Sequence, residues 1–188
     1  MSTRTPVDVA IKPWSDFEVA EQLAFFQRNR EAFAPWEPTR PPEFFELRGQ
    51  RLVNDYARAE WEAGRSHSFG ISARGRGLVG RTSISNVVRS AFQSAHLGYL
   101  VEAALWGQGV ATNAVQLTVR EAFTTFGLHR IEAAIMPRNV RSIRVAEKCG
   151  LVQIGMSPQH LRINGRWEDH ILYAITVDEW SARQASAG

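Results

Sequence analysis

The chain has 188 residues, of which 44% are hydrophobic and 22% charged, and its formal net charge is +3. This length and composition predict one globular domain over residues 1–188, and the small net charge argues against direct binding of nucleic acid. No run of about 18 apolar residues occurs, so we expect no membrane span. The N-terminus lacks the apolar stretch of a signal peptide and Cys149 is the single cysteine, and both features favour a cytoplasmic location.

The first third of the chain is expected to be mainly helical. Alternating residues predict a strand over residues 7–13. Apolar residues spaced by four and three predict a helix over residues 16–33, and the prolines within residues 34–38 end it. A second helix is expected over residues 42–63, just before a glycine.

A hairpin is expected next. We predict strands over residues 67–74 and 78–88, joined by a turn in the Arg-Gly-Arg-Gly sequence of residues 74–77. Residues 75–80 also match the dinucleotide-binding pattern G-x-G-x-x-G. That pattern requires a helix to follow, and the alternation of the following residues predicts a strand, so we reject a dinucleotide site here.

The second half of the chain is expected to alternate strands and helices. The predicted strands cover residues 95–102, 130–136, 151–163 and 167–177, with Asn164-Gly165 as a hairpin turn between the last two. The predicted helices cover residues 110–126, which end at Gly127, and residues 139–149. Hairpins mixed with strand–helix–strand units predict a single-domain α+β (mixed α/β) fold with a mixed sheet, rather than a doubly wound parallel sheet.

The turn at residues 105–113 reads Leu-Trp-Gly-Gln-Gly-Val-Ala-Thr-Asn, between a predicted strand and a predicted helix. The first amides of a helix have no partner within it, and their partial positive charge favours a phosphate. Glycines remove the side chains that would block its approach, which leaves the amides of residues 108–112 and the Thr112 hydroxyl accessible. The alternative is a plain strand-to-helix bend, and this stretch alone favours neither.

A second polar helix start follows at residue 139. Pro137 ends the preceding strand and Asn139 is a candidate N-cap. Asn139, Ser142, Ala146 and Cys149 then share one helical face, because they are spaced by three, four and three residues. This small, partly polar face could contact a ligand, whereas ordinary capping and packing would explain it equally.

Other common catalytic patterns are missing from the sequence. It has no phosphate-binding G-x-x-x-x-G-K-[ST] loop and no G-x-S-x-G nucleophile turn. The five histidines are far apart in sequence and have no metal-ligand spacing, so we expect no metal site.

Taken together, the glycine turn at residues 105–113 and the helix that starts at residue 139 resemble the GNAT acyltransferase superfamily. Its signature is a strand, [QR]-x-x-G-x-[GA], a helix, a strand, and an N-x-x-[SA] helix that ends in G-[FL]; the corresponding residues here are 100–111, 139–142 and 150–151. Within it the chain is most similar to RimJ-type ribosomal-protein-alanine N-acetyltransferases. The shared features are Pro35-Trp36-Glu37-Pro38, Ser85-Asn86-Val87-Val88-Arg89, Leu97-Gly98-Tyr99, His129-Arg130-Ile131, Met136-Pro137-x-Asn139 and Asn164-Gly165-x-Trp167-x-Asp169-His170.

The resemblance implies a GNAT fold whose twisted sheet is splayed between the strands at residues 95–102 and 130–136, with acetyl-coenzyme A in the splay. It implies that the main chain of Leu100 and Val101 pairs with the pantetheine amides, and that Asn139 and Ser142 face the thioester. The residues that it assigns to the diphosphate are Gly107, Gln108, Gly109, Val110, Ala111 and Thr112.

The chain departs from the family pattern at two positions. Trp106 occupies the [QR] position of the turn, and we expect cofactor binding to survive because the site relies on main-chain amides. Many family members carry a tyrosine general acid at the position of Ala146. The resemblance to Rim-type enzymes therefore implies that Ser142 takes the acid role.

The reaction implied is direct attack of a free amine on the thioester. A protein α-amine has a pKa of about 7.7–8.0, against about 10.4 for lysine, so it needs little help to lose its proton. The candidate bases are Glu37, His96 and Asp169. Each also has a structural interpretation: Glu37 as part of the cleft entrance, His96 as a hydrogen-bonded strand residue, and Asp169 as an anchor of the last hairpin.

We therefore expect an acetyl-coenzyme A-dependent N-acetyltransferase that acts on the N-terminal α-amine of a protein. The resemblance points to the terminal alanine of the fifth small-subunit ribosomal protein. Two alternatives stay open: acetylation of a small amine such as an antibiotic or polyamine, and a non-catalytic module that senses acetyl-coenzyme A or binds ribosomal precursors. The sequence is compatible with an oligomer.

Overall fold

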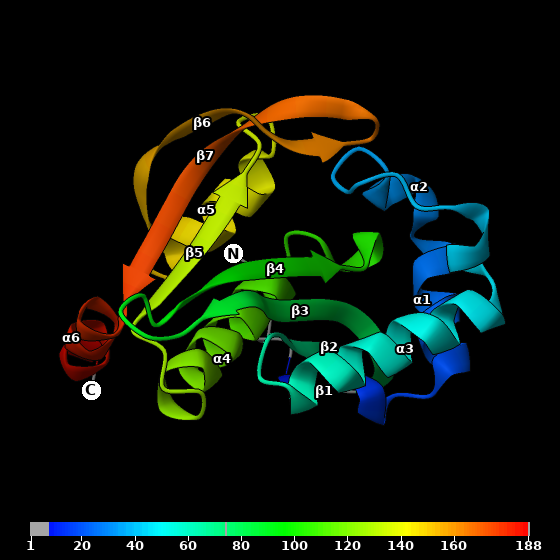
Figure 1. Cartoon of the computed structure of the whole chain (residues 1–188), viewed down its shortest axis with the longest axis horizontal. Helices are drawn as coiled ribbons and strands as arrows, with labels where there is room; N and C mark the ends of the chain where they lie inside the picture. The colour runs from blue at the N-terminus through cyan, green and yellow to red at the C-terminus, as the bar shows by residue number, and fades with distance from the viewer. Residues whose placement is uncertain (1–7, 74, 188) are drawn as a thin grey trace, which may run out of the picture.

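A computed structural model describes residues 8–73 and 75–187, which form one mixed seven-stranded sheet with helices on both faces (Figure 1). The strands are β1 (Val9–Pro13), β2 (His67–Ala73), β3 (Arg76–Val88), β4 (Ser94–Val101), β5 (Arg130–Ile135), β6 (Val152–Ile163) and β7 (Arg166–Thr176). Their order is β1-β2-β3-β4-β5-β7-β6, and within the described residues β4 and β5 are the one parallel pair. The predicted single-domain α+β fold with a mixed sheet is confirmed.

In the described ranges, six helices and three short 3₁₀ turns accompany these strands. The helices are α1 (Val19–Arg28), α2 (Arg30–Phe33), α3 (Leu47–Glu62), α4 (Val110–Thr124), α5 (Val140–Lys148) and α6 (Val177–Ala187). The 3₁₀ turns are η1 (Trp14–Asp16), η2 (Pro42–Phe45) and η3 (Ala103–Leu105). Helices α1 and α3 cover one face of β2 and β3, while α4 covers the opposite face and packs against α5 (Figure 1).

The strands β4 and β5 touch at one end and then separate. Their paired residues are 94–96 with 130–132, and the last pair joins His96 to Glu132. Beyond that point β5 turns away with β7 and β6, so that a wedge opens between it and β4 (Figure 1). This wedge is the splay that the sequence predicted.

Each face of the sheet has its own apolar core. On one face the residues are mainly aromatic: Trp14, Phe17, Phe25, Phe26, Phe33 and Phe44. On the other face the predicted apolar stripe of α4 is confirmed, because Val115, Val119 and Ala122 are each at most 2% exposed. Full burial of one such large side chain stabilises the fold by about 1.5–3 kcal/mol, so these two cores fix the helices on either side of the wedge.

The prediction of one continuous helix over residues 16–33 was wrong, because the structure has two helices there, α1 and α2. It breaks at Asn29, whose φ of −110° and ψ of 6° are not helical. The Asn29 amide donates to the Phe25 oxygen, and its side-chain oxygen accepts the Ala103 N–H. A tertiary contact that the sequence does not reveal therefore ends α1 and starts α2. The predicted helix over residues 42–63 likewise begins as the 3₁₀ turn η2 before α3.

Helix α6 was missed by the sequence analysis, which assigned residue 177 to the last strand. The structure shows a reciprocal cap at its start: the Glu179 N–H donates to the Thr176 hydroxyl, and the Thr176 N–H donates to the Glu179 carboxylate. Such a T-x-x-E capping box is readable from sequence. It was overlooked because the strand pattern of β7 runs directly into it.

The remaining predicted strands and helices agree with the structure to within two residues at their ends, where the structure describes them. Residues 7 and 74, which the predicted strands included, lie outside the described residues. Residues 76–80 of the G-x-G-x-x-G sequence lie within the antiparallel strand β3 and no helix follows them directly, so the rejection of a dinucleotide site on structural context is confirmed. In the described part of the chain, none of the helices combines the length and apolar character that crossing a membrane would need.

Candidate active site

The wedge between β4 and β5 is bordered by the two helix starts that the sequence singled out. Helix α4 begins after the glycine turn that follows β4, and α5 begins after β5. The two helices also touch, since the Cys149 thiol lies 3.5 Å from the main-chain oxygen of Thr112. The wedge is therefore bordered by the edge of β4, by the glycine turn that follows it and by one face of α5.

The end of β4 directs one of its last residues into the wedge. The Glu102 N–H donates to the Val79 oxygen of β3 at 2.8 Å. Because main-chain groups of successive strand residues point to opposite sides, the groups of Leu100 also face β3, whereas those of Val101 face away from it. The indole N–H of Trp106 donates to the Val101 oxygen at 2.8 Å, which agrees with this direction.

The glycine turn is built for backbone access. Gly107 has a φ of 73° and Gly109 a φ of 84°, conformations that side-chain-bearing residues rarely adopt. Nothing lies within 4 Å of the position that a Cβ atom would take at either glycine. Gly109 is the N-cap of α4, so the amides of residues 110–112 have no acceptor within the helix and carry the positive end of its dipole.

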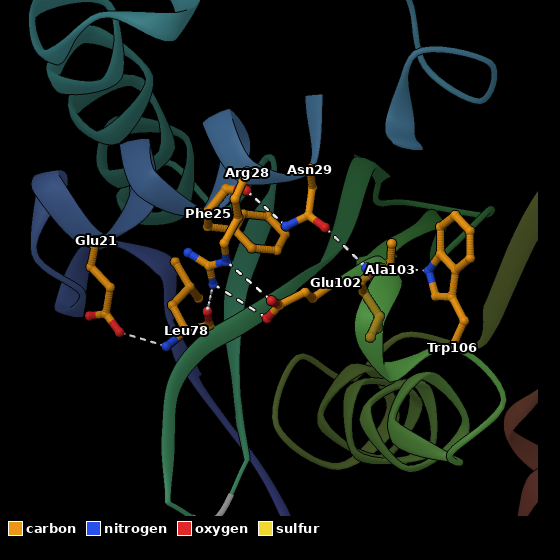
Figure 2. A network of polar contacts seen from close by, with 9 residues as sticks. Glu21, Phe25, Arg28, Asn29, Leu78, Glu102, Ala103 and Trp106 are labelled. Carbon is orange, nitrogen blue, oxygen red and sulfur yellow. Dashed lines mark hydrogen bonds and ion pairs between the residues drawn. The ribbon is translucent and has the colours of Figure 1, made fainter. Parts of the chain in front are cut away.

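A polar network fixes the start of this turn to α1 (Figure 2). The Asn29 side chain accepts the Ala103 N–H at 3.0 Å and is itself only 2% exposed. Next to it, the Arg28 guanidinium pairs with Glu102 at 3.3 Å and donates to the Leu78 oxygen. The turn is therefore held from the side of the N-terminal helices, which favours a rigid loop.

The start of α5 presents Ser142 toward β4. The Asn139 side chain accepts the Ser142 N–H at 3.2 Å, so the predicted N-cap is confirmed. The Tyr99 hydroxyl lies 2.7 Å from the Ser142 hydroxyl and donates to the Ser142 main-chain oxygen at 3.0 Å. Burial raises the pKa of Tyr99 above its usual range, although the bond to Ser142 opposes this, so Tyr99 stays protonated and can donate.

The remainder of the α5 face is apolar. Ala146 is fully buried and Cys149 is 8% exposed, both within the main core. Burial raises the pKa of Cys149 to about 12, so it is a neutral thiol at physiological pH. This residue therefore lacks the thiolate that a covalent nucleophile requires.

Of the three candidate bases, His96 lies at the apex of the wedge. Its imidazole Nε2 is 3.9 Å from the Glu132 carboxylate on β5, and its side chain is 56% exposed. Glu132 also accepts from Arg130 at 2.6 Å. A carboxylate beside an exposed imidazole can orient the ring.

The other two candidate bases have structural contacts. The Glu37 carboxylate pairs with Arg40 at 3.2 Å, and the Glu37 main-chain oxygen accepts the Asn164 N–H of the β6–β7 hairpin. The Asp169 carboxylate accepts the Gln159 N–H at 2.8 Å, which holds a bulge in β6 where Gln159 has a positive φ of 49°. The structure thus brings Glu37 to the hairpin and keeps Asp169 within it.

The loop at residues 34–41 and the β6–β7 hairpin meet at the open end of the wedge (Figure 1). Arg138 connects them: it pairs with Glu168 of the hairpin at 3.1 Å and donates to the Pro35 oxygen at 3.2 Å. Its guanidinium also lies 5.7 Å from the ring centre of Trp36. Beneath this loop is a cavity of about 180 Å³, lined by the aromatic residues Phe26, Phe33, Phe44 and Phe45 and by Arg30, Glu37 and Arg40.

Four polar residues at the wedge had no role in the sequence analysis: Tyr99, Glu132, Arg138 and Glu168. Tyr99 was part of the quoted Leu-Gly-Tyr motif, and its position two residues before Val101 places both residues on the same side of β4. No sequence signal identifies the partner on α5, because that pairing depends on how the helix docks.

Comparisons with known proteins agree with this geometry. The family model described as "Acetyltransferase (GNAT) domain" matches residues 9–152. "Probable N-acetyltransferase YjcK" of Bacillus subtilis is 36% identical over 168 residues, which cover 89% of this chain and 93% of that protein. "[Ribosomal protein uS5]-alanine N-acetyltransferase" of Escherichia coli is 30% identical over 162 residues, with 84% and 81% covered.

The fold is also similar to that of a solved structure with a bound coenzyme. "Mycobacterium smegmatis RimJ in complex with CoA-disulfide" superposes with a TM-score of 0.88 at 30% identity, over 98% of this chain and 93% of that one. Among the described residues, no cluster of three or more His, Cys, Asp and Glu side chains could hold a metal ion.

Proposed function

Since the chain belongs to the GNAT acetyltransferase family, we propose that it transfers the acetyl group of acetyl-coenzyme A to the N-terminal α-amine of a protein. A small-subunit ribosomal protein is the first candidate acceptor. The observation that carries this choice is the similarity, over most of both chains, to an enzyme named "[Ribosomal protein uS5]-alanine N-acetyltransferase". The geometry of the wedge supports the reaction type.

The donor would lie in the wedge with its diphosphate on the glycine turn. The amides of residues 110–112 present the positive end of α4, and Gly107 and Gly109 leave the approach open. The pantetheine would run along the Leu100–Val101 segment, with the outward-facing main chain of Val101 as a hydrogen-bonding edge. Asn139 and Ser142 would face the thioester from α5.

The chemistry would be direct attack of the neutral amine on the thioester carbonyl carbon, which forms the amide and breaks the C–S bond. Coenzyme A would leave as its thiolate and then take a proton from solvent. His96 would accept the amine proton, with the Glu132 carboxylate at 3.9 Å orienting the ring. The departing thiolate, whose thiol has a pKa of about 8.5, would accept a hydrogen bond from the Ser142 hydroxyl. In that arrangement the Tyr99 hydroxyl would donate its proton to the Ser142 hydroxyl, 2.7 Å away, in place of the Ser142 main-chain oxygen, and this leaves the serine proton for the thiolate. Cys149, a buried neutral thiol, has no part in this scheme.

The acceptor would enter between the loop at residues 34–41 and the β6–β7 hairpin. This approach is lined by charged and aromatic side chains, among them Trp36, Glu37, Arg138 and Glu168. A flexible peptide terminus fits a passage bounded by two surface segments, because only its first residues need to enter. Here the acceptor class follows from the relatives, and the entrance supports it.

An acceptor screen tests the proposal. The protein is incubated with acetyl-coenzyme A and alanine-start peptides, ribosomal protein uS5, polyamines or aminoglycosides, and mass spectrometry detects the gain of one acetyl group. We expect acetylation of the protein terminus, and modification of small amines alone would contradict the proposed acceptor. Binding of acetyl-coenzyme A without transfer to any acceptor would favour a sensor.

The variant Ser142→Ala separates catalysis from binding. We expect kcat to fall by about a hundredfold while the affinity for acetyl-coenzyme A changes little, because the hydroxyl acts on the departing thiolate. Cys149→Ala is the matched control on the same helix face, and it should retain kcat. An unchanged kcat in Ser142→Ala would remove Ser142 from the mechanism.

A further inference from the structure

The Arg141 guanidinium lies against the Trp106 ring, directly before the glycine turn. The guanidinium carbon of Arg141, in the first turn of α5, lies 3.9 Å from the ring centre of Trp106. Trp106 is the residue directly before Gly107 and occupies the position where the related motif carries Gln or Arg. The stack therefore brings a positive charge from α5 to the turn that leads into α4.

The Trp106 ring is a fixed platform for this cation. Its indole N–H donates to the Val101 oxygen at 2.8 Å, so the ring orientation is set by the end of β4 (Figure 2). A guanidinium stacked on a ring uses its flat face, which leaves the in-plane N–H donors free for a ligand. Five donors in a fork match the oxygens of a phosphate group.

The surroundings of Arg141 favour an anion. Its side chain is exposed, and within residues 8–73 and 75–187 no ion pair to its guanidinium is found. The nearby start of α4 adds a second positive feature, the amides of residues 110–112. Two positive features at one site repel each other unless a negative group lies between them.

Building on the proposed donor site, we infer that Arg141, stacked on Trp106, binds the diphosphate of the coenzyme from the α5 side. The α4 amides contact the same group from the other side. The cation would thus come from a different helix than the glycine turn itself. Trp106 contributes by holding the guanidinium and makes no polar contact with the ligand.

Calorimetric titration with coenzyme A, 3′-dephospho-coenzyme A and pantetheine tests this inference. We expect Arg141→Gln to weaken the first two ligands equally, by about tenfold, because both contain the diphosphate. Pantetheine, which has no phosphate, should bind wild type and variant alike. Equal affinity of Arg141→Gln and wild type for coenzyme A would overturn the inference. So would a loss confined to coenzyme A, because it would assign Arg141 to the 3′-phosphate.

The control Arg51→Gln makes the same charge change on α3, where Arg51 is exposed and on the far face of the sheet. Its affinity for coenzyme A should stay within twofold of wild type. If Arg51→Gln lost as much affinity for coenzyme A as Arg141→Gln, the change in net charge alone would explain both losses. That result would contradict a specific contact of Arg141. If the wild type itself binds no coenzyme A, the proposed function fails, and this outcome is distinct from a failure of Arg141 alone.

Variants of the platform test the role of Trp106. Trp106→Ala should weaken coenzyme A binding as much as Arg141→Gln does, and Arg141→Gln should then cost little further in that background. The double variant Trp106→Arg with Arg141→Gln moves the cation to the turn and should recover affinity. If the double variant of Trp106→Ala and Arg141→Gln lost affinity by the sum of the two single losses, with melting temperatures close to wild type, the two residues would act independently. That result would contradict a stacked pair that binds the ligand as one unit.

Discussion

The donor side and the acceptor side of the wedge are built in different ways. On the donor side, residues 100–142 meet an expected ligand mainly through main-chain groups: the edge of β4, two glycines with positive φ and the amides of α4. On the proposed acceptor side, an exposed side chain joins separate segments: Arg138 pairs with the Glu168 carboxylate and donates to the Pro35 main-chain oxygen. A constant donor can be bound by backbone geometry, whereas a variable acceptor requires side chains.

This difference predicts how each side responds to substitution. Main-chain contacts cannot be removed by changing one functional group, but they fail when the backbone conformation is lost. Side-chain contacts at an exposed surface are individually weak, and each can be changed without disturbing the fold. Variants on the donor side should therefore have larger effects than variants on the acceptor side.

The largest effect is expected for Gly109→Val. A β-branched residue at a φ of 84° is strained, and its Cβ would stand where a diphosphate must approach. We expect the affinity for acetyl-coenzyme A, measured by calorimetry, to fall by about a hundredfold, since several charge-assisted amide contacts would be lost.

The matched control for this variant is Gly127→Val, at the other end of α4. Gly127 also has a positive φ, 60°, and no atom lies within 4 Å of its missing Cβ. Both variants should lose similar thermal stability, but Gly127→Val should keep its affinity for acetyl-coenzyme A. Equal affinity losses in the two variants would mean that strain alone, rather than access to the α4 amides, explains the first result.

An intermediate effect is expected for Tyr99→Phe, at the border of the two sides. Without the phenol, the Ser142 hydroxyl loses its 2.7 Å partner and can rotate away from the thioester. We expect kcat to fall by about tenfold with an unchanged KM for acetyl-coenzyme A. Tyr173→Phe, at another buried tyrosine, should leave both constants unaltered. A raised KM in Tyr99→Phe would indicate a binding role instead.

The same difference explains what could be predicted from sequence. The order of the strands and helices followed from periodicity, and the α5 cap from Asn139, because these signals are local. The open approach at Gly107 and Gly109 was likewise readable, since a glycine has no side chain to block a ligand. The positive φ of both residues is a finding of the structure. The break of α1 at Asn29 was not readable, because a contact to Ala103, 74 residues away, decides it. The pairing of Tyr99 with Ser142 depends on helix docking in the same way.

The smallest effect is expected at the acceptor entrance. Arg138→Gln removes the ion pair to Glu168, and with a side chain 47% exposed this pair contributes little to stability. We therefore expect a normal melting temperature and an unchanged kcat. The KM for the acceptor should rise about threefold, because the loop at residues 34–41 and the hairpin are then joined by the Asn164 to Glu37 main-chain bond without the side-chain contacts of Arg138.

Steady-state kinetics with varied acceptor peptide measures this change, and Arg166→Gln, on the same hairpin, is the charge-matched control. Arg166 is exposed and should leave the acceptor KM as it is. If Arg138→Gln instead raises the KM for acetyl-coenzyme A, the entrance contributes to donor binding. The two sides would then not be separable, and the choice of acceptor would depend on the donor being bound first.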